Sequence, residues 1–282
     1  MLVTTKGFAN MRKSLAHLTL GATPAENIEA AAAAGFGGVG IRICGRYVGD
    51  NSFLDIIGDE AETARLARLA RDAGIVISNV SAFQFYPGLT TDHLRRVVDT
   101  VVELGSNTLV VNCFMPDRGE ALDLFAAYDS MAEKAGASIA LEYLPYSTIT
   151  DLADARTFIA ESKATTARLL IDALHLDRAG DSLDALAALP RKELAFWQIC
   201  DAMRLRGQRP GNEDLMQEAR TARLRLGEGE LPLGELMAVL PDDLEIEYEV
   251  ADAAIRHLPA ADRAKAAMAD LDRFLATAKR AN

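Results

Sequence analysis

LLIDALHLDRAG, the sequence of residues 169–180, joins an apolar run to a cluster of ionisable side chains. The run of Leu and Ile at its start is typical of a buried strand. An acid, a histidine, an arginine and a glycine then follow between Asp172 and Gly180. Because ionisable groups at the end of a buried strand are costly unless they bind something, the stretch is either part of a ligand site or a strand that runs into a solvated turn.

Similar apolar runs recur along the chain and alternate with helical patterns. Strands are expected at residues 14–20, 38–44, 75–85, 108–114, 138–144, 168–174, 194–200 and 244–250. Helices are expected at 24–35, 60–73, 91–104, 121–135, 151–161, 182–188, 234–239 and 260–279. Eight strand–helix units predict a parallel (β/α)₈ TIM barrel, with residues 1–282 as one domain. The alternative is an open doubly wound sheet, but no Gly-x-Gly-x-x-Gly turn follows the first strand.

Side-chain alternation predicts which residues of each strand face the barrel interior. One face of each strand is wholly apolar and fits packing against helices, whereas the other ends in polar groups. The expected inward faces carry Gly38, Gly40 and Arg42; Ala140 and Glu142; Leu170 and Asp172; Phe196, Gln198 and Cys200; and Glu245, Glu247 and Glu249. Active sites of TIM barrels lie where the strands end, so these polar groups are the candidate site.

Four consecutive strands aim Glu142, Asp172, Gln198 and Glu249 at this mouth. Neighbouring strands lie about 4.8 Å apart, so these side chains can converge on one ion. Oxygen donors favour Mn²⁺ or Mg²⁺, and three carboxylates so close together would repel one another without a cation. The alternative is that some of them pair with arginine and only stabilise the barrel. Glu245 or Glu247 could replace Glu249 as the ligand, but Glu249 is nearest the mouth, and Gln198 could instead hydrogen-bond the substrate. Glu247 is expected to pair with an inward cation, for which Arg42 is the candidate.

Further polar residues are expected around the same mouth. His175 lies three residues beyond Asp172, where it can bind a substrate hydroxyl or transfer a proton. His17, in the first expected strand, is a substrate contact or a core histidine. Arg223 belongs to a segment rich in arginine, 203–230, and precedes the turn Gly227-Glu228-Gly229, so it can clamp a phosphate, carboxylate or enediolate. Arg42 and Asp201 are further candidates for substrate binding, although Asp201 could instead orient the ligands or tie down a loop.

Composition limits the partners. The net charge of −11 opposes binding to nucleic acid or to an anionic membrane. The sequence contains no run of eighteen apolar residues, so no transmembrane helix is expected. Residues 1–6 lack the pattern of a signal peptide. The three cysteines, Cys44, Cys113 and Cys200, are far apart and have no metal-binding spacing. They are typical of core thiols in a reducing cytoplasm.

These motifs resemble the sugar phosphate isomerase/epimerase group of the xylose isomerase-like TIM barrels, in the superfamily of family 2 AP endonucleases. The residues that carry the resemblance are Leu141-Glu142-Tyr143, residues 172–180, residues 198–202, Arg223 with residues 227–233, and Glu249-Val250. The resemblance implies a divalent metal at Glu142, Asp172, Gln198 and Glu249, with His175 and Arg223 on the substrate. It also favours a homodimer or homotetramer.

The chain departs from this family pattern at two of the quoted positions. Many relatives have His where Gln198 stands, and Pro where Leu226 precedes the Gly-Glu-Gly turn. The DNA-repair endonucleases of the superfamily use several histidines for a zinc cluster, a pattern that four histidines, two of them on expected helices, cannot match.

The resulting hypothesis is a metal-dependent isomerase or epimerase of a small, sugar-like hydroxy-ketone. Glu142 or Glu249 would remove the proton next to the carbonyl, and the other would return it. Loss of a β-hydroxyl would instead make the enzyme a dehydratase or lyase of a keto-polyol or a dehydroshikimate-like substrate. A third interpretation is a sugar-binding barrel without catalysis.

Overall fold

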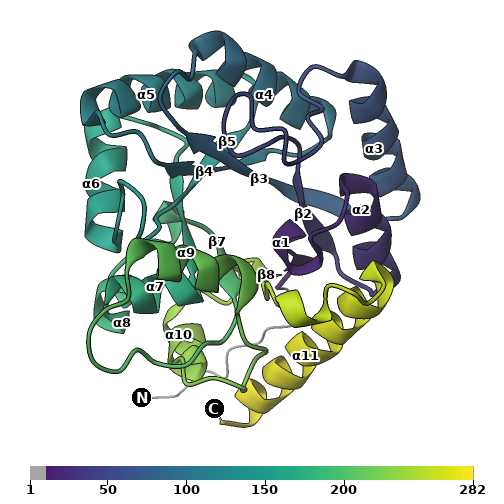
Figure 1. The fold of residues 1–282 in the computed structure, drawn as a ribbon, viewed down its shortest axis with the longest axis vertical. Coiled ribbons are helices and arrows are strands. Elements are labelled where there is room, and N and C mark those ends of the chain that lie inside the picture. The colour runs from purple at the N-terminus through teal and green to yellow at the C-terminus, as the bar shows by residue number, and fades with distance from the viewer. Residues whose placement is uncertain (1–10, 282) are drawn as a thin grey trace.

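The eight strands form a closed barrel in the order of the sequence (Figure 1). The computed structural model describes residues 11–281; residues 1–10, where no signal peptide is expected, lie outside the described part. The strands, all parallel to their neighbours, are β1 (Lys13–Leu15), β2 (Gly38–Arg42), β3 (Val76–Phe85), β4 (Thr108–Cys113), β5 (Ser138–Glu142), β6 (Arg168–Asp172), β7 (Leu194–Ile199) and β8 (Ile246–Tyr248). The barrel closes where β1 pairs with β8, so the predicted (β/α)₈ fold is confirmed.

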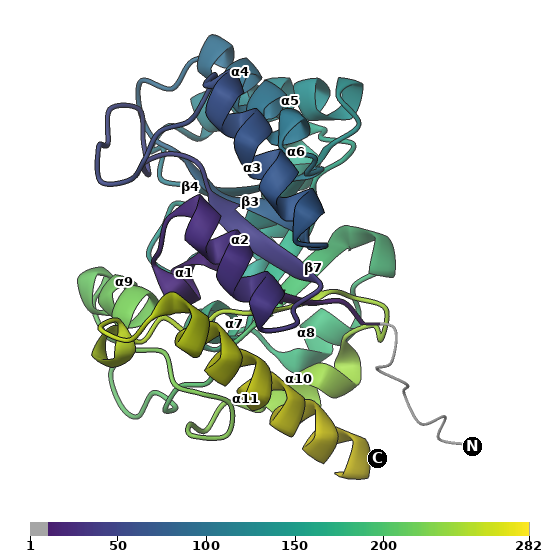
Figure 2. The ribbon, with the colours of Figure 1, turned by 90° about the vertical axis from the view of Figure 1, so that its right-hand side faces the viewer.

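Helices surround this barrel. They are α1 (His17–Leu20), α2 (Pro24–Ala33), α3 (Glu60–Asp72), α4 (Thr91–Glu103), α5 (Arg118–Lys134), α6 (Leu152–Ser162), α7 (Ala173–Ala179), α8 (Leu183–Ala187), α9 (Asn212–Thr221), α10 (Leu233–Val239) and α11 (Ala260–Ala281), with 3₁₀ turns at Arg191–Glu193 and Ala253–Ile255. Figure 2 shows α11 along the side of the barrel next to α2. Of the helices in residues 11–281, none has the length and apolar character needed to span a membrane.

Local sequence signals account for many helix starts. Thr23 accepts a hydrogen bond from the backbone N–H of Glu26, whose carboxylate accepts one from the N–H of Thr23. This reciprocal cap, with Pro24 in the first turn, satisfies backbone groups that would otherwise lack partners.

The core has two parts, as strand alternation predicts. A large cluster of buried apolar residues lies between the strands and the helices. A separate small cluster, Val110, Ala140, Leu170 and Phe196, fills the barrel interior. Glu142, Asp172 and Gln198 follow three of these residues at a spacing of two, so they face the same interior one layer nearer the strand ends.

Four local expectations were wrong. His17 belongs to the short helix α1 and not to the first strand, which ends at Leu15. The sixth strand ends at Asp172, where α7 begins. The polar segment 203–230 contains the helix α9. The last strand is shorter than expected and runs from Ile246 to Tyr248, although the N–H of Glu249 still donates to the carbonyl of Ile199 on β7.

Candidate active site

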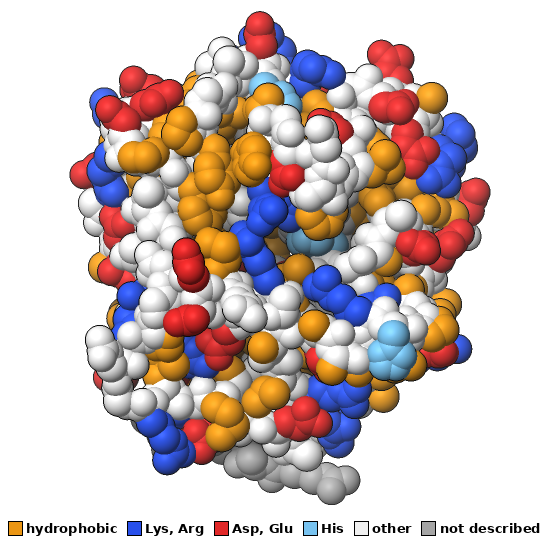
Figure 3. Space-filling view, in the orientation of Figure 1, with side chains coloured by type: hydrophobic (Ala, Val, Ile, Leu, Met, Phe, Trp, Pro, Cys, Tyr) orange, Lys and Arg blue, Asp and Glu red, His pale blue; other side chains and the backbone are white. Residues whose placement is uncertain are grey.

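A pocket of about 370 Å³ opens at the mouth of the barrel, where the strands end. We call it the central pocket. Figure 3 shows a hollow on this face with Lys and Arg side chains at its edge. The sequence-predicted residues that line it are His17, Arg42, Glu142, His175, Gln198, Arg223 and Glu249. Asp172 lies beside them, almost fully buried.

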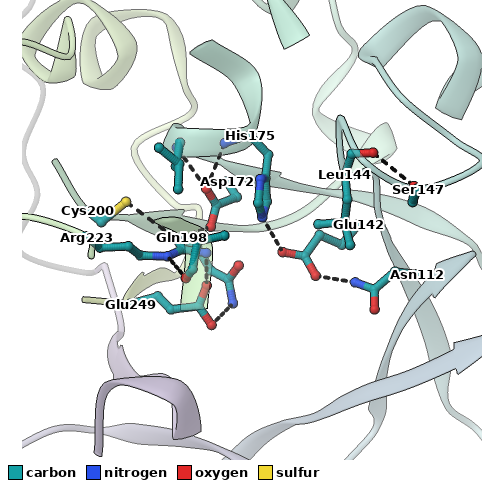
Figure 4. A network of polar contacts seen from close by, with 12 residues as sticks. Asn112, Glu142, Leu144, Ser147, Asp172, His175, Gln198, Cys200, Arg223 and Glu249 are labelled. Atoms are coloured by element: carbon teal, nitrogen blue, oxygen red, sulfur yellow. Dashed lines mark hydrogen bonds and ion pairs between the residues drawn. The ribbon is translucent and has the colours of Figure 1, made fainter. Parts of the chain in front are cut away.

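Asp172 has two structural roles at the end of β6. Its Oδ1 accepts hydrogen bonds from the backbone N–H groups of Leu174 (2.8 Å) and His175 (3.0 Å), so it caps α7. This cap places His175 on the first turn of α7, where its Nε2 lies 3.8 Å from Oε1 of Glu142. Asp172 and His175, at the end of β6 and the start of α7, therefore form one wall of the site (Figure 4).

Asn112 at the end of β4 holds Glu142 from the other side. Its Nδ2 donates to Oε2 of Glu142 at 2.5 Å, and its own Oδ1 accepts from Gln84 at 3.0 Å. Sequence reasoning missed Asn112. The signal was available, because Asn112 follows the inward-facing Val110 by two residues and is therefore on the inward face of β4.

Arg223 is enclosed by acidic side chains. Its Nη1 lies 2.6 Å from Oδ2 of Asp172 and its Nη2 lies 2.9 Å from Oε2 of Glu249, while its Nε donates to the carbonyl of Ala219. The carboxylate–arginine pairing that the sequence left as an alternative is thus present for two of the expected metal ligands. Arg223 still borders the central pocket, but much of its hydrogen-bonding capacity is already used.

Glu247 lies deeper in the barrel and its predicted pairing with Arg42 was wrong. Its carboxylate accepts hydrogen bonds from Nδ2 of Asn79 (2.7 Å) and Nε2 of Gln198 (2.7 Å). Gly40 makes room for it, because a Cβ at this position would come within 2.6 Å of Oε1 of Glu247. Amide donors from neighbouring strands reach this carboxylate, whereas the guanidinium of Arg42 turns toward the carbonyl of Cys44.

Gln198 sits between the acids with one end unused. Its Nε2 donates to Glu247 and, at 3.2 Å, to Glu249. Its Oε1 is buried and has no hydrogen-bond partner among the described residues. A buried carbonyl oxygen without a partner is costly, and an oxygen of this kind is a suitable ligand for a hard cation.

The charges of the site are unbalanced. Glu142, Asp172, Glu247 and Glu249 are all buried. Within residues 11–281, Arg223 is the one cation that forms ion pairs with them, to Asp172 and Glu249, apart from a 3.8 Å contact between His175 and Glu142. Burial, with the nearby charge of Asp172, raises the pKa of Glu142 to about 8. Burial also raises the pKa of Glu249 well above its ordinary value. For Asp172 the charges of Arg223 and His175 outweigh burial and hold the pKa at about 2.

A divalent cation fits this donor set. It would neutralise the excess of carboxylates and bind the unused oxygen of Gln198. Among residues 11–281, Glu142, Asp172 and His175 form a group whose ligand atoms all lie within 4.8 Å of one another. Glu249, the fourth expected ligand, is outside that group because Arg223 and Gln198 hold its carboxylate.

The two histidines of the pocket are uncharged at neutral pH. Burial lowers the pKa of His175 to about 4. Burial, together with the charge of Arg42, lowers the pKa of His17 to about 3. Each ring therefore offers one N–H donor and one nitrogen acceptor rather than a positive charge.

Asp201 does not contact the central pocket, so the substrate-binding role expected for it is not supported. Its carboxylate accepts hydrogen bonds from the backbone N–H groups of Ala202, Gly227, Gly229 and Leu231, at 2.8 to 3.1 Å. Asp201 therefore ties down the Gly-Glu-Gly turn, which was the other interpretation of this residue.

Replacing Asp201 with Ala is expected to lower the free energy of unfolding by roughly 2–4 kcal/mol, because several buried N–H groups would lose their charged acceptor. Urea titration followed by circular dichroism measures this loss. Asp242→Ala, which removes an exposed aspartate in the turn before β8, is the control. A large loss of ligand affinity in Asp201→Ala at unchanged stability would contradict the structural role.

The fold and the acid-lined pocket at the strand ends define a TIM barrel with a candidate metal centre. A family model for the xylose isomerase-like TIM barrel matches residues 28–275. The chain therefore belongs to the xylose isomerase-like TIM barrel family.

Proteins that are similar to this chain in sequence or in fold differ in the functions that their names give. The chain is 26% identical over 241 residues to a 3-dehydroshikimate dehydratase of Pseudomonas aeruginosa, which covers 81% of this chain and 36% of that protein. It thus spans about a third of the length of this relative. The structure of IolI with a bound zinc atom matches with a TM-score of 0.78 at 16% identity, covering 95% of this chain and 99% of IolI. A D-allulose 3-epimerase of Methylomonas sp. matches with a TM-score of 0.67 at 15% identity, covering 94% and 97%.

Proposed function

We propose that this protein is a divalent-metal-dependent enzyme that removes a proton from the carbon next to the ketone of a small hydroxylated substrate. The observation that carries the proposal is the placement of Glu142 and Glu249, from opposite sides of one pocket, with Gln198 and Asp172 between them. A substrate in this pocket would have a carboxylate on each side, which is what proton removal at one face and return at another requires.

The proposed metal ligands are Glu142, Asp172, Gln198 and Glu249, and Mn²⁺ or Mg²⁺ suits their oxygen donors. When bound, such a cation polarises the ketone and makes the neighbouring C–H more acidic. The open Oε1 of Gln198 and the excess of buried carboxylates support this assignment.

Glu142 is the group to which we assign the first proton transfer, because a bound cation would favour its ionised form, which can accept a proton. Asn112 binds its Oε2, which leaves Oε1 on the side of His175. The neutral ring of His175 can then hydrogen-bond a substrate hydroxyl. Glu249 would donate a proton of its own from the other side, and exchange with solvent would restore both side chains, which gives an isomerase or epimerase as the first candidate.

A dehydratase is the second candidate, and two observations favour it. The chain is similar in sequence to a 3-dehydroshikimate dehydratase, although it spans only about a third of that protein. His175 lies 3.8 Å from Glu142, so its N–H can hydrogen-bond a departing hydroxyl while Glu142 passes the proton that it removed to that oxygen, which leaves as water. Proton removal by Glu142 is the step that the two candidates share.

Deuterium exchange distinguishes the candidates. The protein with Mn²⁺ in D₂O is incubated with D-fructose, D-allulose, a keto-inositol and 3-dehydroshikimate, and the products are followed by NMR and ultraviolet absorbance. Deuterium uptake without loss of water indicates an isomerase or epimerase. Loss of water with a new absorbing enone indicates a dehydratase. Binding without either reaction would contradict the proposal and favour a sugar-binding barrel.

Metal binding has its own expected result. We expect about one Mn²⁺ per chain, and Asp172→Asn or Gln198→Leu should lower the affinity on the order of tenfold or more, since each removes a ligand. Calorimetric titration with Mn²⁺ measures this. Glu245→Gln is the matched control, because Glu245 precedes β8 and pairs with Arg12 outside the pocket.

Unchanged affinity in Asp172→Asn would contradict a metal site at this position. Loss of binding in His175→Gln but not in Gln198→Leu would instead assign the ion to the group of Glu142, Asp172 and His175.

We also propose a cytoplasmic location and assembly as a homodimer or homotetramer. The location is supported by three cysteines that are all free and buried. Light scattering of the purified protein measures the assembly.

A further inference from the structure

The edge of the central pocket is rich in arginine, whereas its floor is rich in acid. Arg42, Arg46, Arg220 and Arg256 all line the pocket. They come from the end of β2, the loop after it, the last turn of α9 and the segment before α11. This concentration stands out in a chain with a net charge of −11. Figure 3 shows Lys and Arg side chains around the hollow and His within it.

Arg42 is held in place with part of its guanidinium unused. Its Nε donates to the carbonyl of Cys44 at 2.8 Å, and the guanidinium lies 4.3 Å from the centre of the Phe53 ring. Its Nη2 is buried and has no hydrogen-bond partner among the described residues. A buried cationic N–H without an acceptor costs free energy, so a ligand that accepts a hydrogen bond from Nη2 would be stabilised here.

His17 presents a second unused polar group to the same pocket. Both of its ring nitrogens are buried and have no hydrogen-bond partner in the part of the chain that the structure describes. The charge of Arg42 is close enough to contribute to the low pKa of His17. The two side chains therefore lie near each other and both have free hydrogen-bonding capacity.

The arginines at the edge lack enough counter-charge. Arg46 lies 3.3 Å from Asp50, but neither Arg42 nor Arg220 forms an ion pair with any residue in the range 11–281. Burial is the main cause that lowers the pKa of Arg42 to about 10, and the charges of Arg46 and Arg220 add to it. Guanidinium groups this close repel one another, and an anion that binds between them relieves the repulsion.

We propose that the substrate carries an anionic group, a carboxylate or a phosphate, which Arg42, Arg220 and His17 bind at the edge of the pocket. Arg46 adds to the positive field around this group. The hydroxy-ketone part of the same molecule then lies among the carboxylates of the floor. This inference rests on the proposed function, because it describes the substrate of the same site. The expected substrate is therefore an acidic or phosphorylated polyol and not a neutral sugar.

Matched pairs of probes test the charge requirement by calorimetric titration in the presence of Mn²⁺. Quinate is compared with myo-inositol, and D-fructose 6-phosphate with D-fructose. We expect one anionic probe to bind at least about tenfold more tightly than its neutral partner, and added salt to weaken that binding. A preference for quinate identifies a carboxylate, and a preference for the sugar phosphate identifies a phosphate.

Variants assign the effect to the arginines. Arg42→Gln and Arg220→Gln should each lower the affinity for the preferred anion about tenfold and leave that of its neutral partner nearly unchanged. Arg206→Gln is the control, because Arg206 lies on the same chain segment as Arg220 but is exposed and paired with Glu230. Equal binding within both pairs, no binding of either anion, or an equal effect of Arg206→Gln would overturn the proposal.

These titrations measure binding without turnover. The proposed function fails if no substrate exchanges its proton, whatever the affinities of the probes. The anion proposal fails on affinities alone.

Discussion

Replacing Glu142 with Gln is expected to slow deuterium exchange next to the substrate ketone by about 10²–10⁴-fold, because the side chain can no longer accept a proton. The change keeps the size of the side chain and leaves an amide within reach of Asn112 and His175. NMR in D₂O measures the exchange rate with the substrate that the panel identifies.

Two controls make this result specific. Mn²⁺ affinity is measured in the same variant, because Glu142 is also a proposed metal ligand, and the rate is compared at saturating Mn²⁺. Glu245→Gln changes an acid of the same type outside the pocket and should leave the rate nearly unchanged. Exchange at an undiminished rate in Glu142→Gln would assign the base to another residue, and Glu249 would be the next to test.

Replacing Arg223 with Met is expected to lower the free energy of unfolding by roughly 3–5 kcal/mol, because two buried carboxylates would lose their cation. Arg223 is almost fully buried and bridges Asp172 and Glu249. Methionine fills a similar volume without a charge, so the loss reflects the charge more than the packing.

The pH dependence gives this prediction a second readout. In the native protein the pKa of Asp172 is lowered to about 2, so the ion pair adds stability above the ordinary carboxyl pKa of about 4 and loses it as the pH falls through 2. The deficit of Arg223→Met should therefore be full at neutral pH and shrink below about pH 4.

Denaturation of both proteins at several pH values, with Arg206→Met as an exposed control, measures the deficit. Mn²⁺ should restore part of the lost stability, because it supplies positive charge at the same place. A deficit that does not vary with pH would show that Arg223 acts through packing alone.

Several features of the site could be predicted from the sequence because they follow local rules. Alternation along β5 and β6 placed Ala140 with Glu142 and Leu170 with Asp172, and the structure has the apolar members of these pairs together in the barrel interior. The same rule places Asn112, two residues after Val110, on the inward face of β4.

Other features depend on contacts between distant segments. Glu247 receives Asn79 and Gln198 in place of Arg42, because the register of the strands decides which donors reach it. Asp201 accepts hydrogen bonds from a turn that begins 26 residues later in the sequence. Sequence spacing alone does not distinguish this structural role from a role at the pocket. The grouping of Arg42 with Arg220 joins residues from β2 and α9 that no motif connects.

The sequence by itself determined the barrel, the inward faces of its strands and most of the acids at its mouth. These depend on hydrophobic period and helix capping, which are set by residues a few positions apart. Only the tertiary structure decided which acids pair with Arg223 and which arginines at the edge of the pocket have no ion pair among the described residues. The partners Arg223 and Asp172 are 51 residues apart, and closing the barrel is what brings such charges within reach of each other.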